Sequence, residues 1–128
     1  MRQDGMAIKV SCNIQGIREF QAAIRSFDST MQRYVHTKLV AWAEDVKTEA
    51  MRRAPVRTGY LRSSIYSLVK DWVVNIGAEA TYALFVELGT RTLRARPYLW
   101  PSIQQYLPQL EQIISEAIDA AKAEAGFQ

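Results

Sequence analysis

The sequence predicts an α+β fold, in which a small antiparallel β-sheet packs against a long central helix and a C-terminal helix. Three patterns support this prediction. Apolar and polar residues alternate near the N-terminus, two short apolar segments flank a turn in the middle of the chain, and apolar residues recur at helical spacing over residues 31–53 and again after Pro101. With 128 residues, the chain is expected to form a single domain, residues 1–128.

The composition is that of an ordinary globular protein, with 48% hydrophobic residues and a formal net charge of +3. Cys12 is the only cysteine, which excludes an intramolecular disulfide. The first five residues lack the apolar core of a signal peptide, and no apolar run approaches the ~20 residues of a membrane helix. We therefore expect a soluble protein that is made in the cytoplasm.

The charges are distributed unevenly along the chain. Residues 52–96 hold eight basic and three acidic side chains, whereas residues 99–128 hold one lysine and four acids. These opposite charges can neutralise each other inside the fold or lie on a mixed, solvated surface. They can also serve a head-to-tail contact with a neighbouring copy.

The N-terminal third of the chain predicts a strand and two helices. Residues Ala7 to Ile14 alternate with the period of a strand that has one buried face. Residues 17–27 have the apolar spacing of a short amphipathic helix. A long helix is predicted from Met31 to Arg53, and it ends there because Pro55 disfavours helical geometry in the residue before it. The candidates for its N-cap are Asp28, Ser29 and Thr30.

The middle of the chain predicts a β-hairpin. Gly59 can adopt positive φ, so Thr58-Gly59 is interpreted as a tight turn that leads into a strand from Leu61 to Val69. A second strand is predicted from Trp72 to Ile76, after a turn at Lys70-Asp71 and before Gly77. Both strands are apolar on both faces in places, so part of the second face is expected to meet a helix or another subunit.

The last third of the chain combines an ambiguous segment, a basic loop and a helix. Residues 82–88 fit a helix as well as a strand, and Gly89 ends either one. Residues 90–96 contain three arginines and no acid, and they are expected to form an exposed, mobile loop. Pro101 suits the first turn of the final helix, and Pro108 is expected to kink that helix or to split it.

No catalytic constellation is evident. His36 is the only histidine and lacks Cys or carboxylate partners at ligand spacing, while Cys12 alternates with residues of a buried strand face. Ser63-Ser64 lacks the glycines of a nucleophile elbow, and the six glycines are scattered singly. We therefore expect a protein that is not an enzyme, with no catalytic residue, no metal site and no cofactor.

Three segments carry a resemblance to a known family. They are Ala54-Pro55-Val56-x-Thr58-Gly59-x-Leu61-x-x-Ser64-Ile65, then Tyr82-Ala83-x-x-Val86-Glu87-x-Gly89-Thr90, then Arg96-Pro97-Tyr98-Leu99-x-Pro101. In this order the chain resembles the small head–tail joining, or tail-completion, proteins of long-tailed bacteriophages, the family of gene product ten of phage HK-ninety-seven. Arg57 stands where that family usually carries an acid.

The resemblance implies a structural role in a phage or prophage, with residues 82–88 as a short helix. It implies that the protein joins the tail to a filled head as a neck component, in a ring of six copies that matches the tail's symmetry. The implied partners are other copies of the chain, the head connector, and tail-tube or tail-terminator proteins, close to DNA and without a membrane. The implied location is the host cytoplasm during assembly and then the virion neck. The motif residues are Pro55, Thr58, Gly59, Leu61, Tyr82, Glu87, Gly89, Thr90 and Pro97.

Glu87 follows four apolar residues and precedes a glycine turn. Its carboxylate can accept backbone N–H groups of the Gly89-Thr90 turn, or pair with Arg57 or Arg62, or simply be solvated at the end of an element. The family pattern, which carries a glutamate at this place, favours a bonded carboxylate.

The candidate interface residues are the arginines of the basic loop, because no nearby acid in the sequence neutralises them. Their partner can be an acidic helix of a neighbouring copy, the head connector or the packaged DNA. The residues in question are Arg91, Arg94, Arg96 and, on the helix, Glu111, Glu116 and Asp119.

The alternative function is that of a basic nucleic-acid-binding module. Residues 17–27 and 31–53 could form a helix-turn-helix, but the second helix is balanced in charge. The aromatic residues are predicted to lie in the core rather than among the loop arginines, where a stacking surface would need them.

Overall fold

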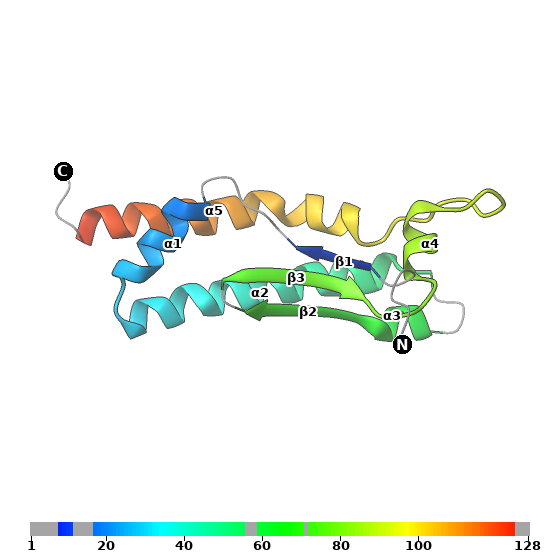
Figure 1. Ribbon diagram of the computed structural model, residues 1–128, viewed down its shortest axis with the longest axis horizontal. Helices are drawn as coiled ribbons and strands as arrows, with labels where there is room; N and C mark the ends of the chain where they lie inside the picture. The colour runs from blue at the N-terminus through cyan, green and yellow to red at the C-terminus, as the bar shows by residue number, and fades with distance from the viewer. Residues whose placement is uncertain (1–7, 12–16, 56–58, 71, 125–128) are drawn as a thin grey trace.

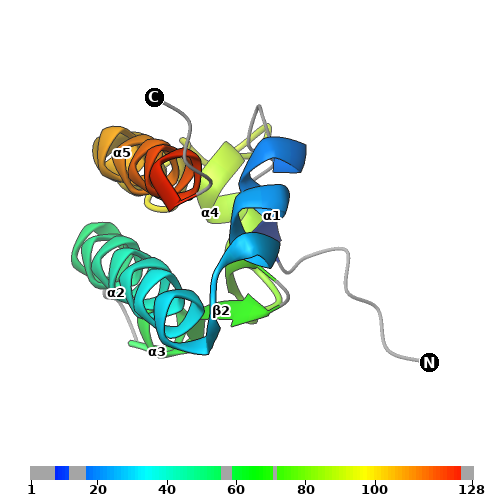
Figure 2. The ribbon, with the colours of Figure 1, turned by 90° about the vertical axis from the view of Figure 1, so that its left-hand side faces the viewer.

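The computed structural model describes residues 8–11, 17–55, 59–70 and 72–124 (Figure 1). Helices α2 and α5 run side by side along the length of an elongated molecule, and the sheet and α1 cover one side of this pair (Figures 1 and 2). The predicted α+β architecture is confirmed. The elements are β1 (Ile8–Ser11), α1 (Ile17–Ser26), α2 (Ser29–Arg53), α3 (Tyr60–Ser64), β2 (Ile65–Lys70), β3 (Val73–Ala78), α4 (Ala83–Leu88) and α5 (Trp100–Glu124).

The sheet has three antiparallel strands in the order β1-β3-β2. Alternate residues of the central strand are buried, namely Val74, Ile76 and Ala78, and they face the helical layer. On the outer face, Leu68 and Val73 keep 52% and 38% of their surface exposed. The sheet therefore presents some apolar surface to solvent, in line with the apolar character of both strands. Predicted strand residues 7 and 12–14, Cys12 among them, lie outside the described part.

The predicted strand from Leu61 is wrong in its first residues, because Tyr60–Ser64 form the short helix α3. Gly59 has φ +80°, as predicted, but it precedes a helical turn in which the Ser63 N–H bonds to its carbonyl at 3.0 Å. The Ser64 hydroxyl donates to the Leu61 carbonyl at 2.8 Å. These local bonds favour a helix until Ile65, where the strand begins. Residues 56–58, including Arg57 and Thr58, lie outside the described residues.

Two further details of the hairpin differ from the prediction. Gly77 does not end the second strand but lies inside β3, opposite Tyr66 and Lys9. The predicted turn at 70–71 is wrong for Lys70, because Lys70 still pairs with Val73 in the sheet. Trp72 adopts φ +65°. The Trp72 ring packs edge-on against Phe20 and His36, at centroid distances of 6.2 and 5.8 Å. Asp71 is outside the described residues.

Helix α2 forms the centre of the core. Asp28 caps it by accepting the Met31 N–H at 2.9 Å, so the helix begins two residues earlier than predicted. The indole N–H of Trp42 donates to the Tyr106 carbonyl at 2.6 Å and ties α2 to α5. Helix α5 continues through the exposed Pro108, so the predicted split does not occur. Met31, where the predicted apolar repeat begins, is only partly buried. The buried residues of α2 are Val35, Leu39, Trp42, Ala43, Val46, Glu49 and Ala50.

Substitutions of Gly59 measure the cost of positive φ without a steric clash, because a Cβ built on it would meet nothing within 4 Å. Gly59→Val should lower the free energy of unfolding by about 1–3 kcal/mol through strain at positive φ. Gly59→Asn should cost less, because asparagine tolerates the left-handed region. Urea unfolding of the three proteins measures this, and equal midpoints would contradict it.

Candidate interaction surface at the arginine loop

Glu87 is buried near the end of α4, with 6% of its surface exposed. Its Oε1 accepts the backbone N–H groups of Tyr98 and Leu99 at 3.0 and 2.9 Å, and its Oε2 accepts that of Trp100 at 3.0 Å. The first N–H groups of a helix have no partner within that helix, and a negative charge is stabilised there. Glu87 therefore caps the N-terminus of α5 from another element.

The prediction of a carboxylate bonded to backbone N–H groups is confirmed in kind, but the predicted donors are wrong. The donors lie 11 to 13 residues further along the chain instead of in the Gly89-Thr90 turn. Arg62 is not a partner either, because its Nε donates to the Met51 carbonyl at 3.0 Å. The donors become close only when the chain between α4 and α5 folds back.

Tyr98 completes this connection at the start of α5. Its side chain is fully buried, and its hydroxyl donates to the Ala83 carbonyl at 3.1 Å. Burial, and then the nearby Glu87 carboxylate, raise the pKa of the Tyr98 hydroxyl far above its usual value, so it remains a neutral donor. The Ser102 hydroxyl bonds back to the Tyr98 carbonyl at 2.6 Å.

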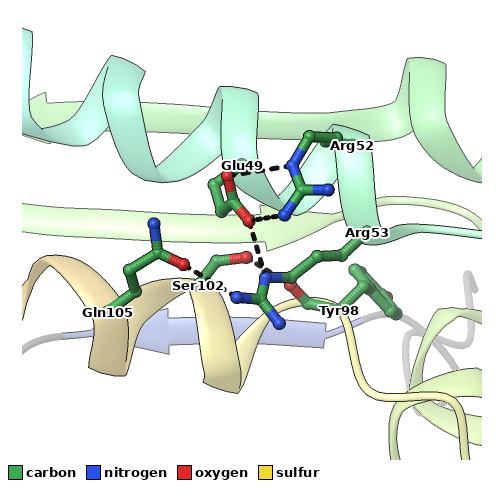
Figure 3. Close-up of polar contacts among 6 residues, drawn as sticks. All are labelled: Glu49, Arg52, Arg53, Tyr98, Ser102 and Gln105. Carbon is green, nitrogen blue, oxygen red and sulfur yellow. Dashed lines mark hydrogen bonds and ion pairs between the residues drawn. The ribbon is translucent and has the colours of Figure 1, made fainter.

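A second buried glutamate ties the C-terminal end of α2 to α5 (Figure 3). Glu49 accepts hydrogen bonds from Arg52, including one from Nε at 3.2 Å, and from Arg53 Nε at 2.8 Å. Arg53 reaches on to the Gln105 side-chain oxygen of α5 at 2.7 Å. The hydrogen bond from Arg52, joined by that from Arg53, lowers the pKa of the Glu49 carboxyl despite its burial.

Residues 90–96, here called the arginine loop, protrude beyond α4 at one end of the molecule (Figure 1). The predicted exposure is confirmed. The loop is closed by backbone bonds, from the Thr90 N–H to the Leu93 carbonyl at 2.9 Å and from the Arg96 N–H to the Val86 carbonyl at 2.9 Å. The Thr90 hydroxyl oxygen also accepts the Leu93 N–H at 3.0 Å. These bonds give the loop a defined shape.

Gly89 allows the two arms of the loop to approach each other. It ends α4, as predicted, with φ +78°. A Cβ built on it would lie 2.7 Å from the Ala95 nitrogen and 3.0 Å from the Leu93 carbonyl oxygen. Only glycine therefore fits where the outgoing arm passes the returning one.

Within the described part of the chain, the charges of the arginine loop have no partner. Arg91, Arg94 and Arg96 are exposed, and no other described residue bonds to their side chains. A groove of about 300 Å³ beside the loop is lined by Pro55, Leu61, Tyr82, Phe85, Val86, Leu93, Arg94 and Arg96. A second groove of about 490 Å³ is lined by Glu87, Leu88, Pro97, Leu99, Trp100, Pro101 and Gln104. We call the loop with its two grooves the arginine-loop surface.

Exposed apolar side chains gather on this surface. Leu88, Leu93 and Trp100 expose 68%, 63% and 52% of their surface. Only charged residues are predicted from the sequence as interface candidates, so these three are missed, although Leu93 lies in the loop that is predicted to be exposed. Tyr82 lies at the start of α4, where its ring packs 6.2 Å from that of Tyr60.

The predicted acids do not meet the predicted arginines within one chain. Glu111, Glu116 and Asp119 are exposed on α5. They follow Trp100 by 11 to 19 residues, or roughly 16–29 Å along a helix that rises 1.5 Å per residue. Any neutralisation of the arginine loop by these acids requires another molecule.

The described part of the chain contains neither a cluster of metal ligands nor a helix that could span a membrane. No three His, Cys, Asp or Glu side chains gather there as metal ligands would. None of the helices there is both long and apolar enough to cross a bilayer.

Comparison with known proteins identifies one family. A family model described as "Bacteriophage HK97-gp10, putative tail-component" matches residues 18–89, more than half of the chain. The match extends from α1 to Gly89 and stops before the arginine loop. Neither the search of curated proteins nor that of solved structures gave a match.

Glu87→Gln tests the cap of α5. The amide keeps one acceptor oxygen but turns an NH₂ group towards a backbone N–H, so the free energy of unfolding should fall by about 1–3 kcal/mol. The exposed acid Glu79 gives the matched control, and Glu79→Gln should stay within about 0.5 kcal/mol of wild type. Urea unfolding measures both, and equal midpoints for the two variants would show that the cap contributes little.

Glu49 should make stability depend on pH. Its pKa is lower in the folded protein than its ordinary value of 4.5, so its contribution is present above that value and is lost as the pH falls through the lower folded pKa. The stability difference between wild type and Glu49→Gln should therefore be largest near neutral pH and shrink below about pH 4.5. Unfolding curves over this range measure it, with Glu111→Gln as the exposed control. A difference that is constant with pH would contradict the assignment.

Proposed function

Because the chain belongs to the HK97-gp10-like family of phage tail components, we propose that it joins the tail to the head as a ring-forming component of the neck. The family is structural and not enzymatic. In this role the protein acts in the host cytoplasm during assembly and stays in the neck of the virion. Its partners are further copies of itself, six in a ring, with the head connector and tail-tube or tail-terminator proteins.

The observation that carries the proposal is the arginine-loop surface. It combines exposed guanidinium groups with grooves that have apolar linings, at one end of an elongated molecule. Arginine and large apolar residues are the side chains enriched at protein interfaces, and the planar guanidinium binds carboxylates in a fixed geometry. The loop's backbone bonds hold this surface in shape before a partner arrives, which reduces the entropy lost on binding.

Nucleic-acid binding is the second candidate, and one observation favours it. Tyr82 and Phe85 line the same groove as Arg94 and Arg96, so the prediction that the aromatic residues lie only in the core is wrong here. Such a groove could stack bases. The rest of its lining is aliphatic, however, which suits a protein better. The exposed side of α2 carries Glu44 and Asp45 as well as Arg33, so it lacks the positive charge that a recognition helix in a DNA groove would use.

The joining role predicts a functional loss without a folding defect. Changing Arg91, Arg94 and Arg96 to Ser should leave the melting temperature nearly unchanged, because exposed loop substitutions usually cost within about 0.5 kcal/mol. The variant should fail to join heads to tails in an in vitro complementation assay. A control that replaces Arg18, Arg25 and Arg33, which are also exposed, removes the same charge elsewhere and should join normally.

Two outcomes of that assay would change the conclusion. If the loop variant joins heads to tails as well as wild type, the arginine-loop surface has no part in joining. If wild type binds DNA tightly and the loop variant loses both this binding and joining, the nucleic-acid function takes precedence.

A further inference from the structure

A third groove lies between α2 and α5, away from the arginine loop. Its volume is about 480 Å³, and its apolar lining includes Ala41, Trp42 and Ile113. Two acids, Asp45 and Glu116, line it as well. Lys38 also lines it, with its ammonium group 5.3 Å from the centre of the Tyr34 ring. We call this the α2–α5 groove; it combines an apolar lining with two acids and one lysine.

The tip of the arginine loop has the complementary character. Leu93 is 63% exposed and lies in sequence between Arg91 and Arg94, whose side chains are also exposed. An apolar side chain next to two cations is complementary to an apolar groove that two acids also line, because apolar surface meets apolar surface and the charges are opposite.

The loop cannot reach the groove of its own chain. The α5 residues that line the groove run from Tyr106 to Glu116, about 9–24 Å along the helix from Trp100. The loop points away from both long helices (Figure 1), and its backbone bonds hold its two arms together. Only a second molecule can bring a loop to this groove.

We propose that the arginine loop of one copy binds in the α2–α5 groove of the next, with Leu93 against the apolar lining and Arg91 and Arg94 facing Asp45 and Glu116. This inference rests on the proposed ring, and it specifies the contact between its copies. The contact joins two different surfaces of the chain, as a head-to-tail assembly requires. The proposed contact uses only one of the three predicted acids of α5: Glu116 lines the groove, whereas Glu111 and Asp119 do not.

Reversal of charge on each surface tests the contact. Loop variant Arg91→Glu/Arg94→Glu and groove variant Asp45→Lys/Glu116→Lys should each self-associate at least about tenfold more weakly than wild type. An equal mixture should recover association, because reversed loops then meet reversed grooves and original loops meet original grooves. Sedimentation equilibrium at low salt and about 0.5 mM protein detects contacts with a Kd near 1 mM. Added salt should weaken wild-type association.

Two further variants locate the contact. Glu111→Lys/Asp119→Lys makes the same charge change on α5 outside the groove, and it should associate like wild type. In a Cys12→Ser background, Leu93→Cys on one copy and Ala41→Cys on another should be cross-linked by a short bismaleimide. Circular dichroism and thermal melts confirm that each variant is folded.

The contact is refuted if wild type stays monomeric under these conditions, if the folded mixture fails to associate, or if the Glu111/Asp119 control weakens association as much as the groove variant does. Complementation with the same proteins separates this result from the joining role. A loop variant that fails in joining, with no recovery in the mixture, would mean that the loop binds another neck protein. A loop variant that joins normally would refute the joining role of this surface as well.

Discussion

The carboxylate of Glu87, with its three backbone hydrogen bonds to the start of α5, determines the geometry of this end of the molecule. Hydrogen bonds to an ionised acceptor are stronger than neutral ones, and those donors would otherwise lie in a buried place without a partner. Because one side chain of α4 receives the first turn of α5, the direction of the long helix is fixed relative to the short one. The loop between them must then begin and end at adjacent points, with the Arg96 N–H on the Val86 carbonyl.

Five of the eight basic residues between positions 52 and 96 form two contrasting groups. Arg52 and Arg53 lie at the negative end of the α2 dipole and bond to the buried Glu49, so their charge is used within the fold. The arginines of the loop have no such acid among the described residues, and their charge faces outward. Part of the positive charge of this segment is therefore concentrated on one exposed surface, the arginine loop, and is not spread evenly over the molecule.

The elements that the sequence predicts well are those whose apolar residues repeat over several turns or pairs. Helix α2, helix α1 and strand β1 follow from spacing, because a buried face imposes its period on the residues. Helix α3 does not, since its five residues are too few for a period and depend on Gly59 and two serine hydroxyls. In the sequence Gly77 suggests the end of a strand, but in the structure it lies inside β3, because the strands on both sides pair with it.

The arginines of the candidate site could be predicted as unpaired charge, and Glu87 as a bonded acid. The donors to Glu87 could not, because they come close only when the chain between α4 and α5 folds back. Nor could the groove that Asp45 and Glu116 both line, because it forms only where α2 packs on α5. The apolar contribution of Leu93 and Trp100 to this surface could not be predicted either, since a sequence pattern cannot distinguish an apolar residue that packs within the chain from one that faces outward.

In the proposed ring, the close approach of backbone at Gly89 has a consequence for the number of subunits. When a chain binds its neighbour through two different surfaces, the rotation from one copy to the next is the same at every step, and it decides between a closed ring and an open helix. A floppy connection would permit a range of rotations and therefore rings of mixed size. In the proposed contact, the close approach at Gly89 and the backbone hydrogen bonds of the loop favour one shape of the loop, and thereby one rotation from each copy to the next.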